Sequence, residues 1–144
     1  MYQYKVTLRR VVDGDTVDVD IHLGFGVVLS NERIRLNGID APESRTSDKV
    51  EKIFGNLAKS RLNDLLADGD LVLVSDEFNP VGKFGRVLGD ILVNGVSVCD
   101  TLINECYAAP YHGGSKELIE NAHLENRETL IKRGVVNEHD ISNI

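Results

Sequence analysis

The spacing of apolar residues changes after the first third of the chain, and this change constrains the fold more than any other feature of the sequence. Before it, residues 2–8, 17–23 and 33–36 alternate apolar with polar side chains, as in strands with one buried face. After it, apolar residues between Val50 and Leu66 recur at steps of three and four, as on one face of a helix. The sequence therefore predicts three strands followed by an amphipathic helix.

Local signals mark the ends of that helix and the elements after it. Asp48, with Glu51 three residues later, is typical of a helix N-terminus, and Gly69 follows the predicted end. The Asn94-Gly95 pair is a strong hairpin-turn signal between two later strands. The later strands are predicted at residues 71–75, 86–93 and 96–98, and two further helices at about residues 100–106 and 116–132, the last ended by Gly134.

Three strands, a helix and two further strands follow one another in the order of an OB-fold. We therefore expect an α+β protein that is mainly β, built as a five-stranded OB-fold barrel with about three helices. At 144 residues the chain fits one domain, which we expect to cover residues 1–144.

Composition argues against several classes of protein. No apolar stretch is long enough for a signal peptide or a membrane span, so we expect a cytoplasmic protein without a membrane partner. Cys99 and Cys106 stand in one helix-like segment, where about two turns, or ~10 Å, would separate them, too far for a disulfide. No cysteine or histidine has zinc-site spacing, so the histidines are interpreted as ordinary polar residues: His22, His112, His123 and His139.

The net charge of −7 argues against tight non-specific binding of nucleic acid. It leaves room for a small metal-dependent site, because a bound cation and a few arginines can reverse the potential locally. A general single-strand binder of the OB-fold type would need an aromatic-rich basic groove, and this acidic chain with few aromatic residues fits that poorly.

Acidic and arginine side chains recur where the predicted strands break into turns. Carboxylates hold a hard divalent cation, two guanidiniums grip a phosphate, and one further carboxylate remains to act on water. These are the minimal parts of a metal-assisted phosphodiester hydrolase. The residues are Asp13, Asp15, Arg35, Asp40, Glu43 and Arg86.

Each segment also has a plainer interpretation. The Asp-Gly-Asp sequence is an ordinary turn, Arg35 suits a structural salt bridge to a nearby acid, and Gly-Lys-Phe-Gly-Arg suits a hairpin loop. The joint occurrence is far more specific than any one of them.

Taken together, the three segments resemble the staphylococcal (thermo)nuclease family. Its signatures are an Asp-Gly-Asp-Thr turn, an Arg-x-x-x-x-Asp-x-Pro-Glu segment and a Lys-[Tyr/Phe]-Gly-Arg loop, and all stand here in order. The resemblance covers about residues 11–111, and a helix at about 116–133 matches only in general character. It implies an OB-fold barrel, consistent with the predicted strands.

The resemblance implies a role for each matching residue. Asp15 and Asp40 would ligate Ca²⁺ together with the backbone carbonyl of Ala41, leaving room for waters and a substrate phosphate. Asp13 would hold water or orient the turn, and Glu43 would act on the attacking water.

The remaining matches would contact the substrate. Arg35 and Arg86 would grip the phosphate and stabilise the charge of the transition state. Lys83, Phe84 and Tyr111 match positions that line the nucleotide site, although Tyr111 equally suits a tyrosine packed under the last helix. The chain departs from the family where many relatives carry threonine at Ala41 and tyrosine at Phe84, and neither departure removes an acid or arginine.

The leading hypothesis is therefore a Ca²⁺-dependent nuclease that hydrolyses DNA and RNA with little sequence preference and leaves 3′-phosphate ends. The alternative is a catalytically inactive nuclease-like module that binds nucleic acid or protein, but such a copy would be expected to lose an acid or an arginine. We expect a monomer, and a small nuclease of this kind suits a phage or mobile-element origin.

Overall fold

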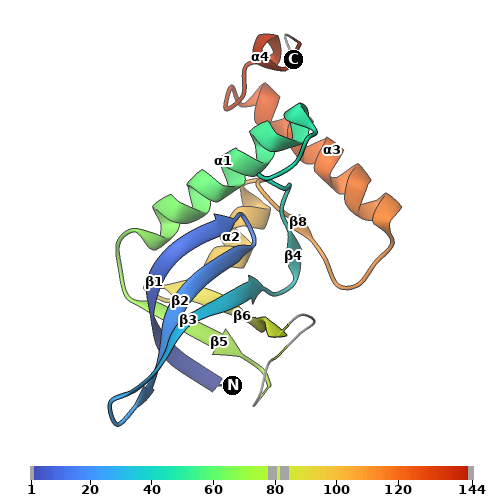
Figure 1. The fold of residues 1–144 in the computed structure, drawn as a ribbon. Helices are drawn as coiled ribbons and strands as arrows, with labels where there is room; N and C mark the ends of the chain where they lie inside the picture. Colours follow the sequence, from blue (N-terminus) through green and yellow to red (C-terminus); the bar gives the residue numbers. More distant parts are fainter. Residues whose placement is uncertain (1, 78–80, 82–84, 143–144) are drawn as a thin grey trace.

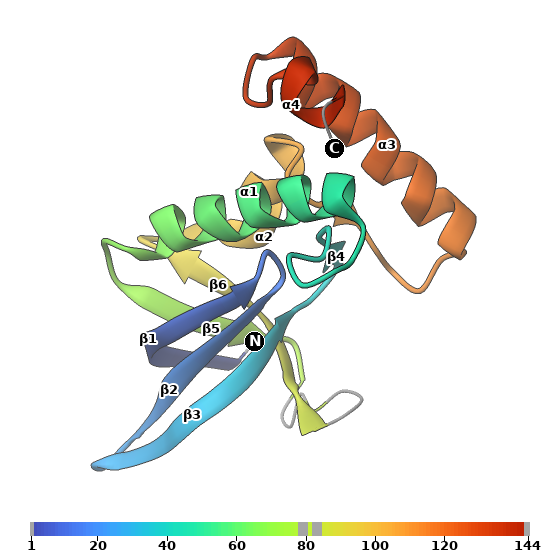
Figure 2. The ribbon, with the colours of Figure 1, turned by 45° about the horizontal axis from the view of Figure 1, so that its top comes forward.

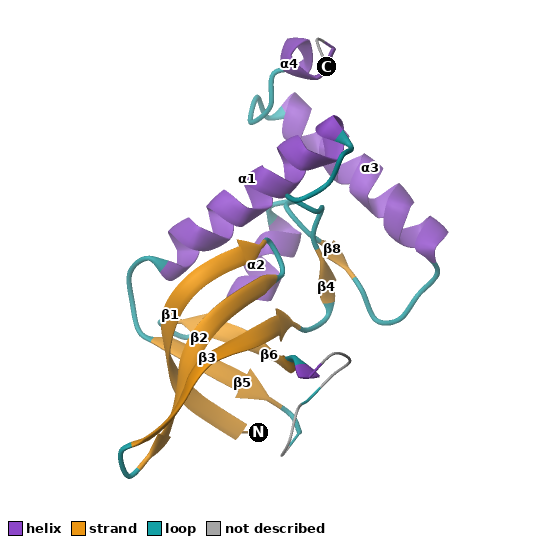
Figure 3. Cartoon of the chain, viewed as in Figure 1, coloured by secondary structure: helices purple, strands orange, loops and turns teal. Residues whose placement is uncertain are grey.

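The computed structural model describes residues 2–77, 81 and 85–142, and within them five strands close into a barrel (Figure 1). Neighbouring strands pair antiparallel in the order β3-β2-β1-β5-β6, and a parallel pairing of β3 with β6 closes the ring (Figure 3). The predicted OB-fold, mixed α and β but mainly β, is confirmed. The barrel strands are β1 (Tyr2–Asp13), β2 (Thr16–Gly24), β3 (Val27–Leu36), β5 (Leu71–Ser75) and β6 (Val87–Val93).

The other elements lie around this barrel. A two-stranded ribbon leaves the end of β3, β7 continues the edge beyond β6, and the helices lie over one end of the barrel (Figure 1). These elements are β4 (Ile39–Asp40) paired with β8 (Ala109–Pro110), β7 (Val96–Ser97), α1 (Lys49–Leu66), α2 (Val98–Asn104), α3 (Lys116–Lys132) and α4 (Glu138–Ser142).

Some predicted boundaries were wrong. α2 begins at Val98, before the predicted start, because the Ser97 hydroxyl caps it by accepting the N–H of Asp100 at 3.1 Å. The ribbon β4–β8 and the short helix α4 were not predicted, so the described residues form four helices where about three were expected. Two-residue strands and a single helical turn carry no apolar periodicity, which explains why the sequence did not reveal them.

The barrel core follows the predicted alternation. Val17, Val19 and Ile21 of β2 are buried, as are Ile34 and Leu36 of β3. Strand pairing places Val17 opposite Ile34, so the apolar faces of both strands point to the same core. The core therefore fixes the register of β3, the strand that carries Arg35 into the site described below.

Helix α1 crosses one end of the barrel (Figure 2). The Asp48 carboxylate caps it as predicted, accepting the N–H groups of Val50 and Glu51 at 3.1 Å each. The turn between β1 and β2 approaches the helix so closely that a Cβ on Gly14 would lie 2.6 Å from the Cβ of Ala58. Only glycine fits this turn without displacing α1.

A second, smaller apolar cluster fastens α3 to α1. Leu130 of α3 is 2% exposed and packs with Phe54 of α1 and with Val136. The Arg127 guanidinium also lies over the Phe54 ring, 5.4 Å from its centroid. Helix α3 is thereby held at a fixed position beside the ribbon β4–β8.

Two further expectations concern the class of protein. Cys99 and Cys106 are free, as expected, but the predicted shared helix was wrong, because α2 ends at Asn104. Among the described residues, no helix has both the length and the apolar character that a membrane span requires.

Candidate active site

Arg35 stands at the centre of the candidate site. Its side chain is only 16% exposed, at the end of β3. Nη1 donates to the carbonyl of Leu36 at 2.7 Å and Nη2 donates to the carbonyl of Ile39 at 2.9 Å. These hydrogen bonds to backbone carbonyls fix the guanidinium, and the segment between β3 and β4 wraps around it.

Two carboxylates from different parts of the chain converge on this arginine. Asp15 Oδ2, from the turn after β1, lies 3.5 Å from Arg35 Nη2. Asp40 Oδ1, on β4, lies 3.7 Å from the same nitrogen. The structure thus brings together the two acids that the sequence analysis predicts as metal ligands.

Asp15 is held in a buried position. Its Oδ2 accepts the backbone N–H of Ala41 at 3.0 Å and its Oδ1 accepts the Thr16 hydroxyl at 2.9 Å. Burial raises its pKa above the usual 3.8, while Arg35 and these hydrogen bonds act in the opposite direction and the Asp40 charge raises it further. A carboxylate whose charge is incompletely compensated in this way would be stabilised by a bound cation.

The donor set fits a hard divalent cation in part. Asp15, Asp40 and the Ala41 carbonyl provide only oxygen donors, which Ca²⁺ and Mg²⁺ prefer. In the described part of the chain, no group of three or more acidic, histidine or cysteine side chains is arranged to hold a metal ion. A cation here would therefore complete its coordination with waters and substrate oxygens, as an open catalytic site requires.

Asp13 and Glu43 are connected through Ser44. Asp13 does not join the pair of acids at Arg35; its Oδ1 accepts the backbone N–H of Ser44 at 3.1 Å and also the Ser44 hydroxyl. Glu43, the preceding residue, has an exposed side chain between buried Pro42 and buried Ser44. Helix α1 touches the same segment, since a Cβ on Gly55 would lie 2.2 Å from the Glu43 carbonyl oxygen. The loop is therefore fixed while the Glu43 carboxylate faces solvent.

Of the remaining predicted residues, the structure describes Arg86 and Tyr111. Arg86 is partly buried and directly precedes β6, whose first residue Val87 pairs with Ile34 next to Arg35. Tyr111 follows β8, is 39% exposed and donates its backbone N–H to Gly38 at 2.9 Å. The predicted substrate contacts Lys83 and Phe84 lie outside the described residues.

One contact was missed by sequence reasoning. His123, interpreted there as an ordinary polar residue, reaches Asp40 from α3, with 2.7 Å between Nε2 and Oδ2. The two residues are 83 positions apart and no spacing pattern links them, so the sequence held no signal for the contact.

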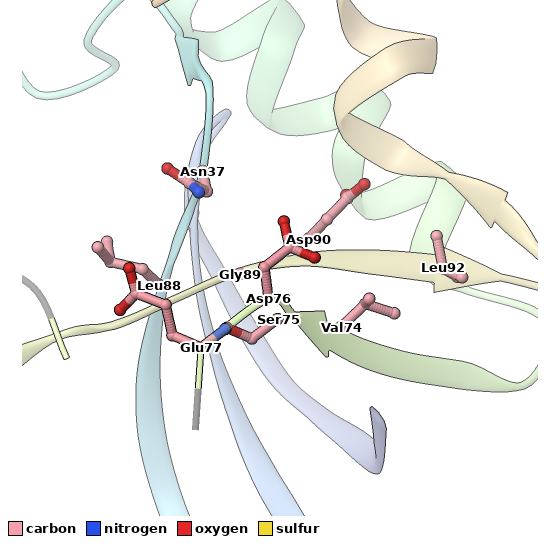
Figure 4. A pocket seen from close by; sticks show the side chains of 9 residues that line it. All are labelled: Asn37, Val74, Ser75, Asp76, Glu77, Leu88, Gly89, Asp90 and Leu92. Carbon is pink, nitrogen blue, oxygen red and sulfur yellow. The ribbon is translucent and has the colours of Figure 1, made fainter. Parts of the chain in front are cut away.

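A hollow lined by other residues does not suit a phosphodiester substrate. It lies between the ends of β5 and β6, and Figure 4 shows Asn37, Glu77 and Asp90 among its lining side chains. Asp90 is occupied with structural bonds, accepting the N–H of Ile91 at 2.8 Å and the Ser97 hydroxyl. With acidic side chains and no basic one among its lining residues, this hollow would repel a phosphodiester.

Comparison with known proteins agrees with the geometry. The family described as Staphylococcal nuclease homologue matches residues 33–136. The chain is 31% identical over 125 residues to endonuclease YncB of Bacillus subtilis (strain 168), a match that covers 85% of the chain and 56% of the relative. It is 36% identical over 100 residues to the SPbeta prophage-derived endonuclease YokF of the same organism, covering 69% of the chain and 32% of the relative.

A plant relative is also similar to the chain over part of its own length. The probable staphylococcal-like nuclease CAN1 of Oryza sativa subsp. japonica is 33% identical over 104 residues, covering 72% of the chain and 28% of that protein. The chain thus spans between about half and about a quarter of the length of these curated relatives.

Proposed function

Because the chain belongs to the staphylococcal nuclease family, we propose that it is a nuclease that hydrolyses the phosphodiester bonds of DNA and RNA. The activity depends on Ca²⁺, has little sequence preference and leaves 3′-phosphate ends. The single observation that carries the proposal is the convergence of Asp15 and Asp40 on the buried guanidinium of Arg35.

This arrangement suits phosphodiester hydrolysis because the aspartates can bind a cation while the arginine can bind the negatively charged phosphate. Asp15, Asp40 and the Ala41 carbonyl would hold Ca²⁺, which when bound would supply positive charge against the phosphate and its transition state. Arg35 and Arg86 add hydrogen-bond donors to the same phosphate oxygens. Arg35 is supported for this role by the two backbone carbonyls that already fix its orientation.

The proposed reaction is an in-line displacement. Glu43 accepts a proton from a water molecule, and the water oxygen forms a bond to phosphorus while the bond from phosphorus to the 5′ oxygen breaks. The departing 5′ oxygen takes a proton from solvent water and becomes a hydroxyl, the phosphate stays on the 3′ oxygen, and Glu43 returns its proton to solvent. The exposed carboxylate of Glu43 on a loop fixed by Asp13 and Gly55 supports this assignment.

The alternative is an inactive module that only binds nucleic acid or protein. A degenerate copy would be expected to lack one of the acids or arginines of the site. The chain retains Asp15, Arg35, Asp40 and Glu43, and the first three lie together, with both aspartates within 3.7 Å of Arg35 Nη2, so hydrolysis is the better-supported function.

The test is cleavage of single-stranded DNA, double-stranded DNA and RNA by the purified chain, with Ca²⁺ or with chelator. The substitution Glu43→Gln should lower the cleavage rate by about 10²–10⁴-fold, because it removes the base but preserves the side-chain shape. Glu138→Gln, at an exposed glutamate of α4, is the matched control and should retain the wild-type rate.

Product ends complete the test. Products with 3′-phosphate ends accept a new nucleotide from a polymerase only after phosphatase treatment. Nucleic-acid binding without cleavage, equal in wild type and Glu43→Gln, would overturn the proposal in favour of the inactive module.

A further inference from the structure

Helix α3 brings a histidine to one of the proposed metal ligands. His123 Nε2 lies 2.7 Å from Asp40 Oδ2, and the histidine side chain is 14% exposed. His123 follows the three family motifs in the sequence and has no metal-site spacing to other histidines or cysteines. Its contact with Asp40 is a product of the tertiary structure alone.

The position of the ring is set by neighbours on the same helix face. Asn126, Arg127 and Leu130 follow His123 at three-, four- and seven-residue steps, so all four side chains lie on one side of α3. Asn126 Nδ2 donates to the carbonyl of Ala108 at 3.2 Å, and Leu130 is buried against Phe54 of α1. The helix cannot rotate or slide without breaking these contacts.

The β4–β8 ribbon is connected to both Asp40 and the helix that carries His123. Asp40 pairs with Ala109 in the β4–β8 ribbon, and Ala108, which binds Asn126, directly precedes Ala109. The backbone that carries Asp40 and the helix that carries His123 are therefore fastened to each other within a few residues of the contact. Together, the strand pairing and the Asn126 hydrogen bond hold the Asp40 carboxylate and the His123 imidazole in one relative orientation.

The two carboxylate oxygens of Asp40 have different partners. Oδ2 faces the histidine, and Oδ1 faces Arg35 Nη2 at 3.7 Å. His123 Nδ1 is buried and has no hydrogen-bond partner among the described residues, so the ring is held to Asp40 through Nε2, which donates to the carboxylate oxygen Oδ2. With Oδ2 occupied by this donor, Oδ1 is left on the side of Asp15 and Arg35.

We propose that His123 is a positioning residue that fixes the Asp40 carboxylate so that Oδ1 stays on the side of Asp15 and Arg35, where the two aspartates would hold a divalent cation. The inference rests on the proposed function, since it deepens the account of the same metal site. It also makes α3 part of that site, although the helix contributes no ligand. Partners that orient a ligating group commonly strengthen metal binding by about 10- to 100-fold.

The test compares two variants of nearly equal length, His123→Gln and His123→Met. Glutamine places an N–H donor where Nε2 stands, and methionine fills similar space without a donor. Calcium titration calorimetry on the full chain, without nucleic acid, should show about 10- to 100-fold weaker binding for His123→Met and a smaller loss for His123→Gln. His22→Ala is the control, because His22 bonds the Thr7 hydroxyl on the barrel and not the site.

The cleavage rate at saturating Ca²⁺ distinguishes a positioning role of His123 from a catalytic one. At saturating Ca²⁺ the cleavage rate of His123→Met should approach that of the wild type, because the lost orientation is compensated by mass action. Thermal unfolding in chelator should show that both variants remain folded.

The outcomes are distinguishable. Wild-type protein that binds Ca²⁺ and cleaves, with His123→Met binding Ca²⁺ as tightly, would overturn this inference alone. Wild-type protein that neither binds Ca²⁺ nor cleaves would overturn the proposed function and this inference with it.

Discussion

Asp13 Oδ1 accepts the backbone N–H of Ser44 at 3.1 Å, across 31 positions of sequence. The same oxygen accepts the Ser44 hydroxyl, so the end of β1 holds the loop that carries Glu43. The family resemblance predicts Asp13 as a residue that holds water or orients the turn, and the structure shows a carboxylate bound to the loop of the proposed base. Four predictions test how this and neighbouring contacts maintain the site.

The first prediction concerns Asp13→Ala. Loss of both bonds leaves the N–H of buried Ser44 without its acceptor, and we expect a loss of about 1–3 kcal/mol in the free energy of unfolding. Cleavage should slow while Ca²⁺ affinity stays near wild type, because Asp13 does not contact Asp15 or Asp40 in the described contacts. Ser44→Ala keeps the backbone bond and should cost less; an equal loss in both variants, measured by urea denaturation, would contradict this account.

The second prediction concerns Gly55→Ala. In an ordinary helix this change stabilises by about 1 kcal/mol. Here the new Cβ would lie 2.2 Å from the Glu43 carbonyl oxygen, so we expect a destabilisation of about 1–3 kcal/mol and slower cleavage. Asn56→Ala, at the exposed neighbouring position of α1, is the control and should be neutral or slightly stabilising. A Gly55→Ala protein as stable as that control would show that the loop moves aside at little cost.

The third prediction concerns the pH dependence of stability at Asp15. Its folded pKa lies above 3.8, so the folded protein binds the proton more tightly than the unfolded chain does. The stability gained from binding this proton is fully present below about pH 3.8 and is lost as the pH rises through the folded pKa. Asp15→Asn removes the buried charge, and its stability relative to wild type should therefore improve between acidic and neutral pH.

The measurement for Asp15→Asn is urea denaturation in chelator at about pH 4 and pH 7. Added Ca²⁺ should then stabilise the wild type at neutral pH but not the variant, because the site has lost a ligand. A difference between the two proteins that stays constant with pH would refute the role of Asp15 burial.

The fourth prediction concerns Leu130→Ala. The side chain is 2% exposed between α3 and α1, and its truncation should destabilise the protein by about 2–5 kcal/mol. Ca²⁺ affinity should fall as well, because a loosened α3 no longer holds His123 against Asp40. Leu124→Ala, at a 52% exposed position of the same helix, is the matched control and should leave the affinity unchanged. Unaltered Ca²⁺ binding in a folded Leu130→Ala protein would separate α3 from the metal site.

Several elements were predictable because their signals are local. The Asp48 cap, the turn at Asn94-Gly95 and the bounds of β5 and α3 each depend on residues a few positions apart. The family motifs were equally readable, since each is one short segment. The ribbon β4–β8 was missed because Ile39 and Pro110 pair across a long stretch of chain and each strand has only two residues.

The sequence by itself determined the barrel and its main helix, and it identified Asp15, Arg35 and Asp40, which the structure brings together. Periodicity, caps and short motifs depend on neighbouring residues, so they can be read without the fold. Only the tertiary structure decided how those side chains are held: Asp13 on Ser44, Gly55 beneath Glu43, and His123 on Asp40. These contacts join segments that meet only after the barrel and helices pack, and close packing, not local propensity, selects which donor faces which carboxylate.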